Sequence, residues 1–185
     1  MDFGADVSSS LGDVVGTVER VVMDLDTNEV LEYIVHKTVG LVGDVVVPNG
    51  VVSNTTNDAL VLSIPTSAVE GLPDYVHSKF GARLHPPGAP LPGIGAGPPA
   101  PTAPVRAAPK SVEISGKTRL ECEDGQIGNV EGVVVDEMTS EITDLIVEVR
   151  ALRRKVRVPM AWTSSLQNEV IRLQCVRADI EGLAS

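Results

Sequence analysis

Aromatic residues are scarce in this chain of 185 residues, which has two phenylalanines, two tyrosines and one tryptophan. Proteins that bind single-stranded nucleic acids stack the bases on aromatic side chains, so this composition offers few platforms for such binding. The formal net charge of −10 also opposes contact with phosphate groups, which depends on lysine and arginine. We therefore expect no direct binding of nucleic acids.

Long apolar runs are absent as well. No run approaches the roughly 18 residues that a membrane span needs. Residues 1–4 have neither the basic nor the apolar region of a secretory signal. We therefore expect a cytosolic protein without a membrane span, a prediction that stays compatible with peripheral association with a membrane complex.

Cysteine and histidine are rare. Cys122 and Cys175 each follow hydrophobic residues at a spacing of two, so both are expected to face one interior as reduced thiols. A disulfide between them stays open if the strands that carry them are neighbours. His36, His77 and His85 show no metal spacing, and no serine lies in a nucleophile elbow. The sequence predicts no metal, no cofactor and no catalytic residue, so we expect a protein that is not an enzyme.

The most informative feature present is an internal repeat. Residues 12–18 read GDVVGTV and residues 124–130 read DGQIGNV, and a β-branched run ending in aspartate follows each. Val-Pro and a terminal Glu-Gly-Leu come later in both copies. Corresponding residues are 112 positions apart at first and 111 positions apart from Val-Pro onward. A period of this length indicates a duplicated domain.

Each copy is expected to be a small β-barrel. In the first copy, strands are predicted over residues 14–23, 30–35, 44–48 and 59–64, with polar turns at 24–28 and 54–58. Residues 67–70 have capping-box spacing and predict one helical turn. Gly16 and Gly128 are predicted to lie at equivalent corners where backbones approach closely. The fold class is therefore all-β, with a short helical turn in each unit.

The predicted organisation has four parts. Residues 1–10 form an N-terminal arm, 11–78 the first barrel, 79–112 a linker rich in proline, glycine and alanine, and 113–185 the second barrel. The linker composition favours polyproline II, so the barrels are expected to be spaced without rigid docking. PxxP spacings occur at residues 87–90 and 101–104, but no arginine lies in clear register with them, and we assign them no ligand role.

Both copies share Gly-x-Val (within Gly-x-x-x-Gly-x-Val in the first copy and Asp-x-x-x-Gly-x-Val in the second), a β run ending in aspartate, Val-Pro and a terminal Gly-Leu. This shared pattern resembles the PRC-barrel family. That family is named for the cytoplasmic domain of the photosynthetic reaction-centre H subunit, and it includes the C-terminal half of the ribosome-maturation factor RimM. The resemblance covers residues 11–76 and 116–184, and it implies small barrels that work by binding proteins. The chain departs from both relatives, since it has neither a membrane helix ahead of the barrel nor a different N-terminal barrel.

One turn resembles a calcium-binding loop. Asp24-x-Asp26-x-Asn28 copies the first three ligand positions of an EF-hand, but that loop also requires glycine at position six and glutamate at position twelve. The sequence has Glu29 and Val35 at those positions. We interpret the segment as a hairpin turn with solvated carboxylates.

Basic residues gather in one place of this acidic chain, namely at Arg150, Arg153, Arg154, Lys155 and Arg157. They surround a predicted hairpin, whereas the matching residues 38–43 of the first copy carry no charge. Two interpretations are open. The cluster is either a solvated hairpin tip or an electrostatic docking patch for a protein partner, with the acidic first barrel of another copy as one candidate.

These observations together predict a non-enzymatic protein–protein interaction module that acts as an adaptor or assembly factor. The partners expected are other proteins, or further copies of the chain in a homo-oligomer. The alternative is a peripheral structural subunit of a larger complex, such as an electron-transport, photosynthetic or cell-division assembly.

Overall fold

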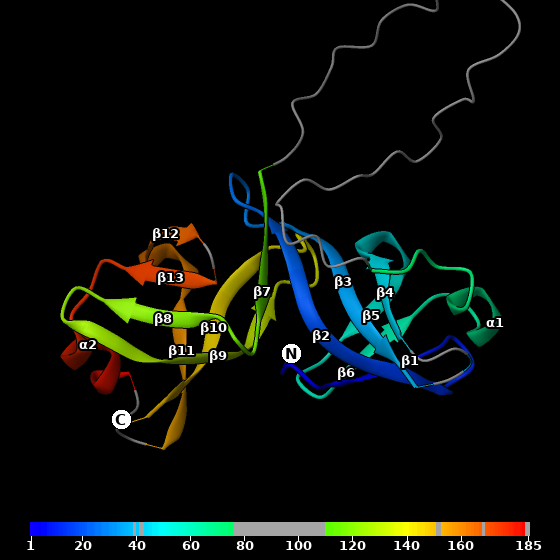
Figure 1. Cartoon of the computed structure of the whole chain (residues 1–185), viewed down its shortest axis with the longest axis horizontal. Coiled ribbons are helices and arrows are strands. Elements are labelled where there is room, and N and C mark those ends of the chain that lie inside the picture. The colour runs from blue at the N-terminus through cyan, green and yellow to red at the C-terminus, as the bar shows by residue number, and fades with distance from the viewer. Residues whose placement is uncertain (39, 41–42, 76–109, 151–152, 168, 184–185) are drawn as a thin grey trace, which may run out of the picture.

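The computed structural model describes residues 1–38, 40, 43–75, 110–150, 153–167 and 169–183 (Figure 1). The first repeat comprises β1 (Asp6–Ser8), β2 (Val14–Asp24), β3 (Val30–Lys37), β4 (Gly43–Pro48), η1 (Asn49–Val51), β5 (Val52–Thr55), β6 (Ala59–Leu62) and α1 (Thr66–Val69). After β7 (Ser111–Ser115), the second repeat comprises β8 (Arg119–Cys122), β9 (Gly125–Val135), β10 (Ile142–Val149), β11 (Arg154–Pro159), η2 (Met160–Trp162), β12 (Thr163–Gln167), β13 (Val170–Leu173) and α2 (Arg177–Gly182). Within these described ranges, no helix is long and apolar enough to span a membrane.

The two sheets have the same strand order. The first runs β4-β3-β2-β1-β6-β5, and the second runs β11-β10-β9-β8-β13-β12. Along both orders neighbouring strands are antiparallel, except that β1 lies parallel to β6 and β8 lies parallel to β13. The predicted fold class, two similar and mostly β units, is confirmed.

Equivalent glycines lie in the long strands β2 and β9. A Cβ added at Gly16 would lie 2.2 Å from the carbonyl oxygen of His36, and one added at Gly128 would lie 1.9 Å from that of Glu148. The backbone of the neighbouring strand therefore occupies the space that a side chain would need. The predicted close approach at these two positions is confirmed.

The repeats exchange short segments across their boundary. β7 precedes the second repeat in sequence, yet it pairs with β2 of the first sheet. In return, residues 1–3 lie along β9, where Phe3 N donates to Glu131 O at 2.8 Å and Val133 N donates to Met1 O at 2.9 Å. The prediction that the barrels would not dock rigidly is therefore wrong. Residues 1–3 belong to the interface rather than to a separate arm, and the chain's N-terminal end lies between the two units (Figure 1).

Two equivalent turns also meet at the boundary. Val30 N donates to Ser140 O and Ile142 N donates to Asn28 O, both at 2.9 Å. Asn28 and Ser140 have nearly equal positive φ angles of 60° and 59°. Each bond is the counterpart of the other under the sequence repeat, and such reciprocity is the mark of a two-fold relation. The chain thus resembles a symmetric dimer joined into one polypeptide.

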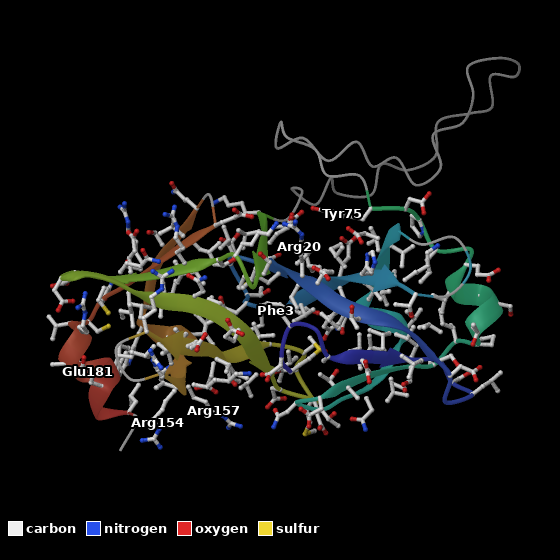
Figure 2. All side chains as sticks on the ribbon, turned by 60° about the horizontal axis from the view of Figure 1, so that its bottom comes forward. Phe3, Arg20, Tyr75, Arg154, Arg157 and Glu181 are labelled. Carbon is white, nitrogen blue, oxygen red and sulfur yellow. The ribbon has the colours of Figure 1, made fainter. Side chains whose placement is uncertain are left out.

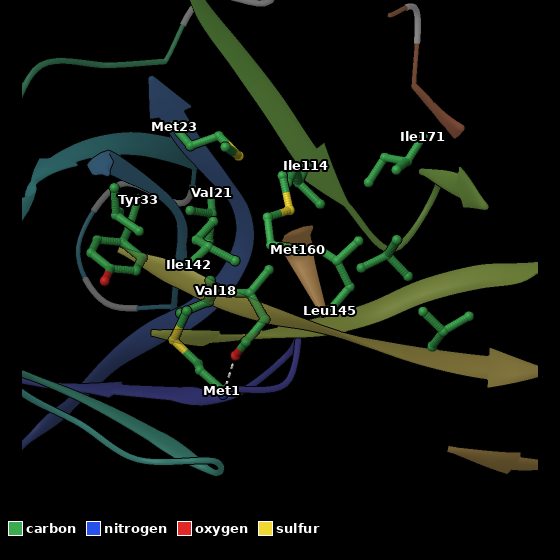
Figure 3. Packing of buried hydrophobic residues seen from close by; sticks show 14 of the residues in the cluster. Met1, Val18, Val21, Met23, Tyr33, Ile114, Ile142, Leu145, Met160 and Ile171 are labelled. Atoms are coloured by element: carbon green, nitrogen blue, oxygen red, sulfur yellow. Dashed lines mark hydrogen bonds between the residues drawn. The ribbon is translucent and has the colours of Figure 1, made fainter. Parts of the chain in front are cut away.

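One hydrophobic cluster runs through both repeats. It includes Val21 and Tyr33 from the first sheet, Ile114 from β7, and Leu145 and Met160 from the second repeat. Figure 3 shows these side chains converging between the two units. A domain of about 60 residues buries only roughly 60% of its unfolded surface, so a shared core supplies burial that each small repeat lacks alone.

Several local predictions differ from the structure. Residues 6–8 form β1, in which Val7 is fully buried, although they were expected to belong to a polar arm. β5 occupies part of the stretch that was expected to be a turn. The predicted helical turn is present as α1, but it begins after Pro65 and has no side-chain cap, so the capping box that its spacing suggested does not form. The PxxP spacings fall in residues 76–109, outside the described residues.

Candidate functional site

The predicted basic cluster lies on the hairpin formed by β10 and β11. Val156 and Val158 pair with strand β10 and are buried, whereas Lys155 and Arg157 alternate with them and are exposed. Arg153, which precedes β11, has a positive φ of 49° that turns the chain into the strand. Within the described residues β11 pairs only with β10, so it forms one edge of the second sheet.

Within the described residues, one cation of the cluster is in an ion pair and the others are not. The Nζ atom of Lys155 lies 2.5 Å from the Asp2 carboxylate, and this hydrogen bond raises the pKa of Lys155. Lys155 therefore helps to hold the exchanged residues 1–3. The other members are exposed and have no ion pair within the described part of the chain: Arg150, Arg153, Arg154 and Arg157. Arg154 and Arg157 point away from the sheets (Figure 2).

The corresponding edge of the first repeat is built differently. There Val46 takes the place of Arg157 and packs with Val22 and Ile34 in a small apolar cluster on the outer face of the sheet. Tyr75 packs against this cluster. The same position is thus apolar and covered in one repeat, and cationic and exposed in the other.

A polar cluster at the repeat boundary was not predicted from the sequence. The guanidinium of Arg20 lies 3.7 Å from Glu113 of β7 and 3.8 Å from Glu169 of the second repeat. The Tyr75 hydroxyl donates to Glu113 at 2.8 Å, and its ring lies 5.9 Å from the Arg20 guanidinium carbon (Figure 2). These residues are far apart in sequence, so no local spacing could have identified the cluster. Its contacts join the repeats.

The two cysteines are buried and face each other. Cys122 ends β8, Cys175 follows β13, and their sulfur atoms are 2.8 Å apart although both residues are free thiols. Burial raises the pKa of the Cys122 thiol. The predicted common interior is confirmed, and because β8 and β13 are neighbours, the geometry also meets the condition set for a disulfide.

The turn that resembles a calcium loop has a structural role. The Asp24 carboxylate accepts the amide of Asp26, and the main chain of Asn28 contacts the second repeat as described above. The equivalent Asp136 accepts the amides of Thr139 and Met138, which lowers the pKa of that carboxyl. Among the residues that the structure describes, no group of three or more His, Cys, Asp or Glu is arranged to hold a metal ion.

A polar cleft of about 220 Å³ also lies at the repeat boundary, where its lining includes Tyr33 and Asn54 of the first repeat and Asp136, Glu137 and Ser140 of the second. Burial raises the pKa of Tyr33. Three polar lining residues have apolar counterparts in the other repeat: Leu25 matches Glu137, Met160 matches Asn49, and Leu166 matches Thr55. The cleft therefore reflects divergence of the repeats, and the exposed arginines of β11 remain the stronger candidate for a functional site.

No family model and no curated protein matches the chain.

Proposed function

We propose that the protein is a non-enzymatic interaction module that acts as an adaptor or assembly factor and docks an acidic protein partner on β11. One observation carries the proposal. In a chain of net charge −10, exposed arginines that have no ion pair within the described residues gather at one sheet edge. The first repeat has uncharged residues at the positions of these arginines, and Asp44 at the position of Lys155. Cations kept free of internal partners are available to a partner from outside and would attract acidic surfaces.

The joined repeats support this proposal because they provide a firm frame for the edge. β11 is attached to β10, whose turn contacts the first repeat, and Lys155 is anchored to Asp2. Sites presented by rigid strands lose little freedom on binding. The resemblance of residues 11–76 and 116–184 to PRC-barrels points in the same direction, since it implies barrels that work by binding proteins.

Affinity purification followed by mass spectrometry tests the proposal. Tagged full-length protein is compared with a double variant, Arg154→Glu with Arg157→Glu, and with a matched control, Arg119→Glu with Arg172→Glu, which makes the same charge change on β8 and β13. We expect partners that are retained by the wild type and the control, are lost from the edge variant, and dissociate as the salt concentration rises.

Two results would contradict the proposal. Partners that bind the wild type, the edge variant and the control equally would show that β11 is not part of the binding surface. Retention of partners that does not depend on the salt concentration would exclude an electrostatic mechanism of binding. Recovery of the chain itself as the acidic partner would agree with the proposal and identify a homo-oligomer.

A further inference from the structure

The first repeat shows what can pair with the edge that β11 forms in the second. Residues 73–75 lie along β4, the strand equivalent to β11, in antiparallel orientation. Val46 N donates to Pro73 O at 2.9 Å, and Tyr75 N donates to Asp44 O at 2.7 Å. A short extended segment, with an aspartate at its centre, thus acts as one more strand.

Because β11 is equivalent to β4 in the repeat, its main-chain groups have the same orientation. Asp44 and Val46 match Lys155 and Arg157, so the carbonyl of Lys155 and the amide of Arg157 face away from β10. No segment of the described residues pairs with this edge. Outward main-chain groups in an extended strand are a template for another strand.

The charges around this edge indicate that a segment that binds there is acidic. Arg153, Arg154 and Arg157 are exposed beside the outward main-chain groups, and within the described residues none of them has an acidic partner. An incoming basic strand would be repelled, whereas carboxylate side chains would lie next to arginines that form strong, charge-assisted hydrogen bonds.

We infer that β11 binds an extended acidic segment of a partner protein by antiparallel strand addition, in the way that residues 73–75 bind β4. The inference rests on the proposed function and specifies its partner. Main-chain hydrogen bonds would supply attachment, and carboxylates would supply selectivity, as in other strand-addition complexes.

A synthetic peptide tests the inference on the full chain. The probe is a fluorescein-labelled octapeptide of alternating glutamate and valine, and its binding is followed by fluorescence anisotropy. We expect saturable binding, protection of the Arg157 amide from hydrogen exchange, and at least a tenfold weaker affinity in the variant Arg154→Glu with Arg157→Glu. The control Arg119→Glu with Arg172→Glu should bind as the wild type does.

A second peptide separates strand addition from charge attraction alone. It has the same sequence but carries N-methyl groups on alternate amides, which removes main-chain donors and leaves the charge unchanged. Equal binding of both peptides would overturn strand addition, while the purification experiment could still support docking on β11. Peptide binding that appears only in a chain shortened to end at Leu183 would also overturn the inference. That result would mean that the removed residues, and not a partner, occupy the edge in the full chain. Equal retention of partners by the wild type, the edge variant and the control in the purification experiment would, by contrast, contradict the proposed function itself.

Discussion

Substituting a buried residue in one repeat should destabilise the other, because the two share a core. Leu60 on β6 of the first repeat is fully buried, and Trp162, the only tryptophan, packs partly buried against the same cluster in the second repeat. Replacing a buried leucine with alanine removes apolar contacts and leaves a cavity, at a cost of about 3 kcal/mol. For a chain of this size, that loss corresponds to a fall in Tm of roughly 6–12 °C.

The assay follows thermal unfolding by Trp162 fluorescence, which reports the second repeat, and by far-ultraviolet circular dichroism, which reports both. With Leu60→Ala we expect the two signals to fall together in one transition. Leu11→Ala is the matched control, since Leu11 also lies in the first repeat but is 74% exposed, and it should leave Tm nearly unchanged. A Trp162 transition that stays at the wild-type temperature while circular dichroism shows a second, earlier one would refute a shared core.

Two further predictions concern single features of the fold. Gly128→Ala should lower the free energy of unfolding, measured by chemical denaturation, by about 2 kcal/mol or more, as overpacked sites do, because the added Cβ would meet the Glu148 carbonyl oxygen. The control Gly50→Ala should leave the free energy of unfolding unchanged, because a Cβ there meets nothing within 4 Å. A glutathione disulfide buffer should convert Cys122 and Cys175 into an intramolecular disulfide, seen as a loss of both free thiols without a change of oligomeric state. Because burial raises the pKa of the Cys122 thiol, the oxidation rate should keep rising with pH beyond the range of an ordinary exposed cysteine; a rate that levels off early would contradict this burial.

The sequence predicted the units well because their local pattern is strong. β2, β3 and β4 are rich in β-branched residues and bounded by polar turns, and the structure places them within about two residues of the predicted ranges. β1 escaped prediction because it has three residues, of which only Val7 is buried. Its pairing with β6 depends on residues more than fifty positions away, and such contacts leave no local signal.

The exchange of segments could not be predicted for a related reason. β7 has the alternation of a strand, yet nothing in its own residues specifies β2 rather than a strand of its own repeat. The basic cluster is visible in the sequence as a run of charged residues. The sequence does not show which of these residues is in an ion pair. Lys155 is paired with Asp2, a residue 153 positions away, and only the exchange brings the two together.

The joined repeats explain how one edge of the molecule could acquire a surface that the other lacks. In a dimer of identical chains, a substitution on β11 would appear twice, and both edges would carry the same charge. A single polypeptide can retain the reciprocal contacts of Val30 and Ile142 at the boundary while its outer strands differ, as Val46 and Arg157 do. Substitutions at the boundary should therefore alter the stability of both repeats, because the core is shared. Charge reversal of exposed Arg157 should alter binding and leave Tm nearly unchanged, because an exposed side chain contributes little to folding.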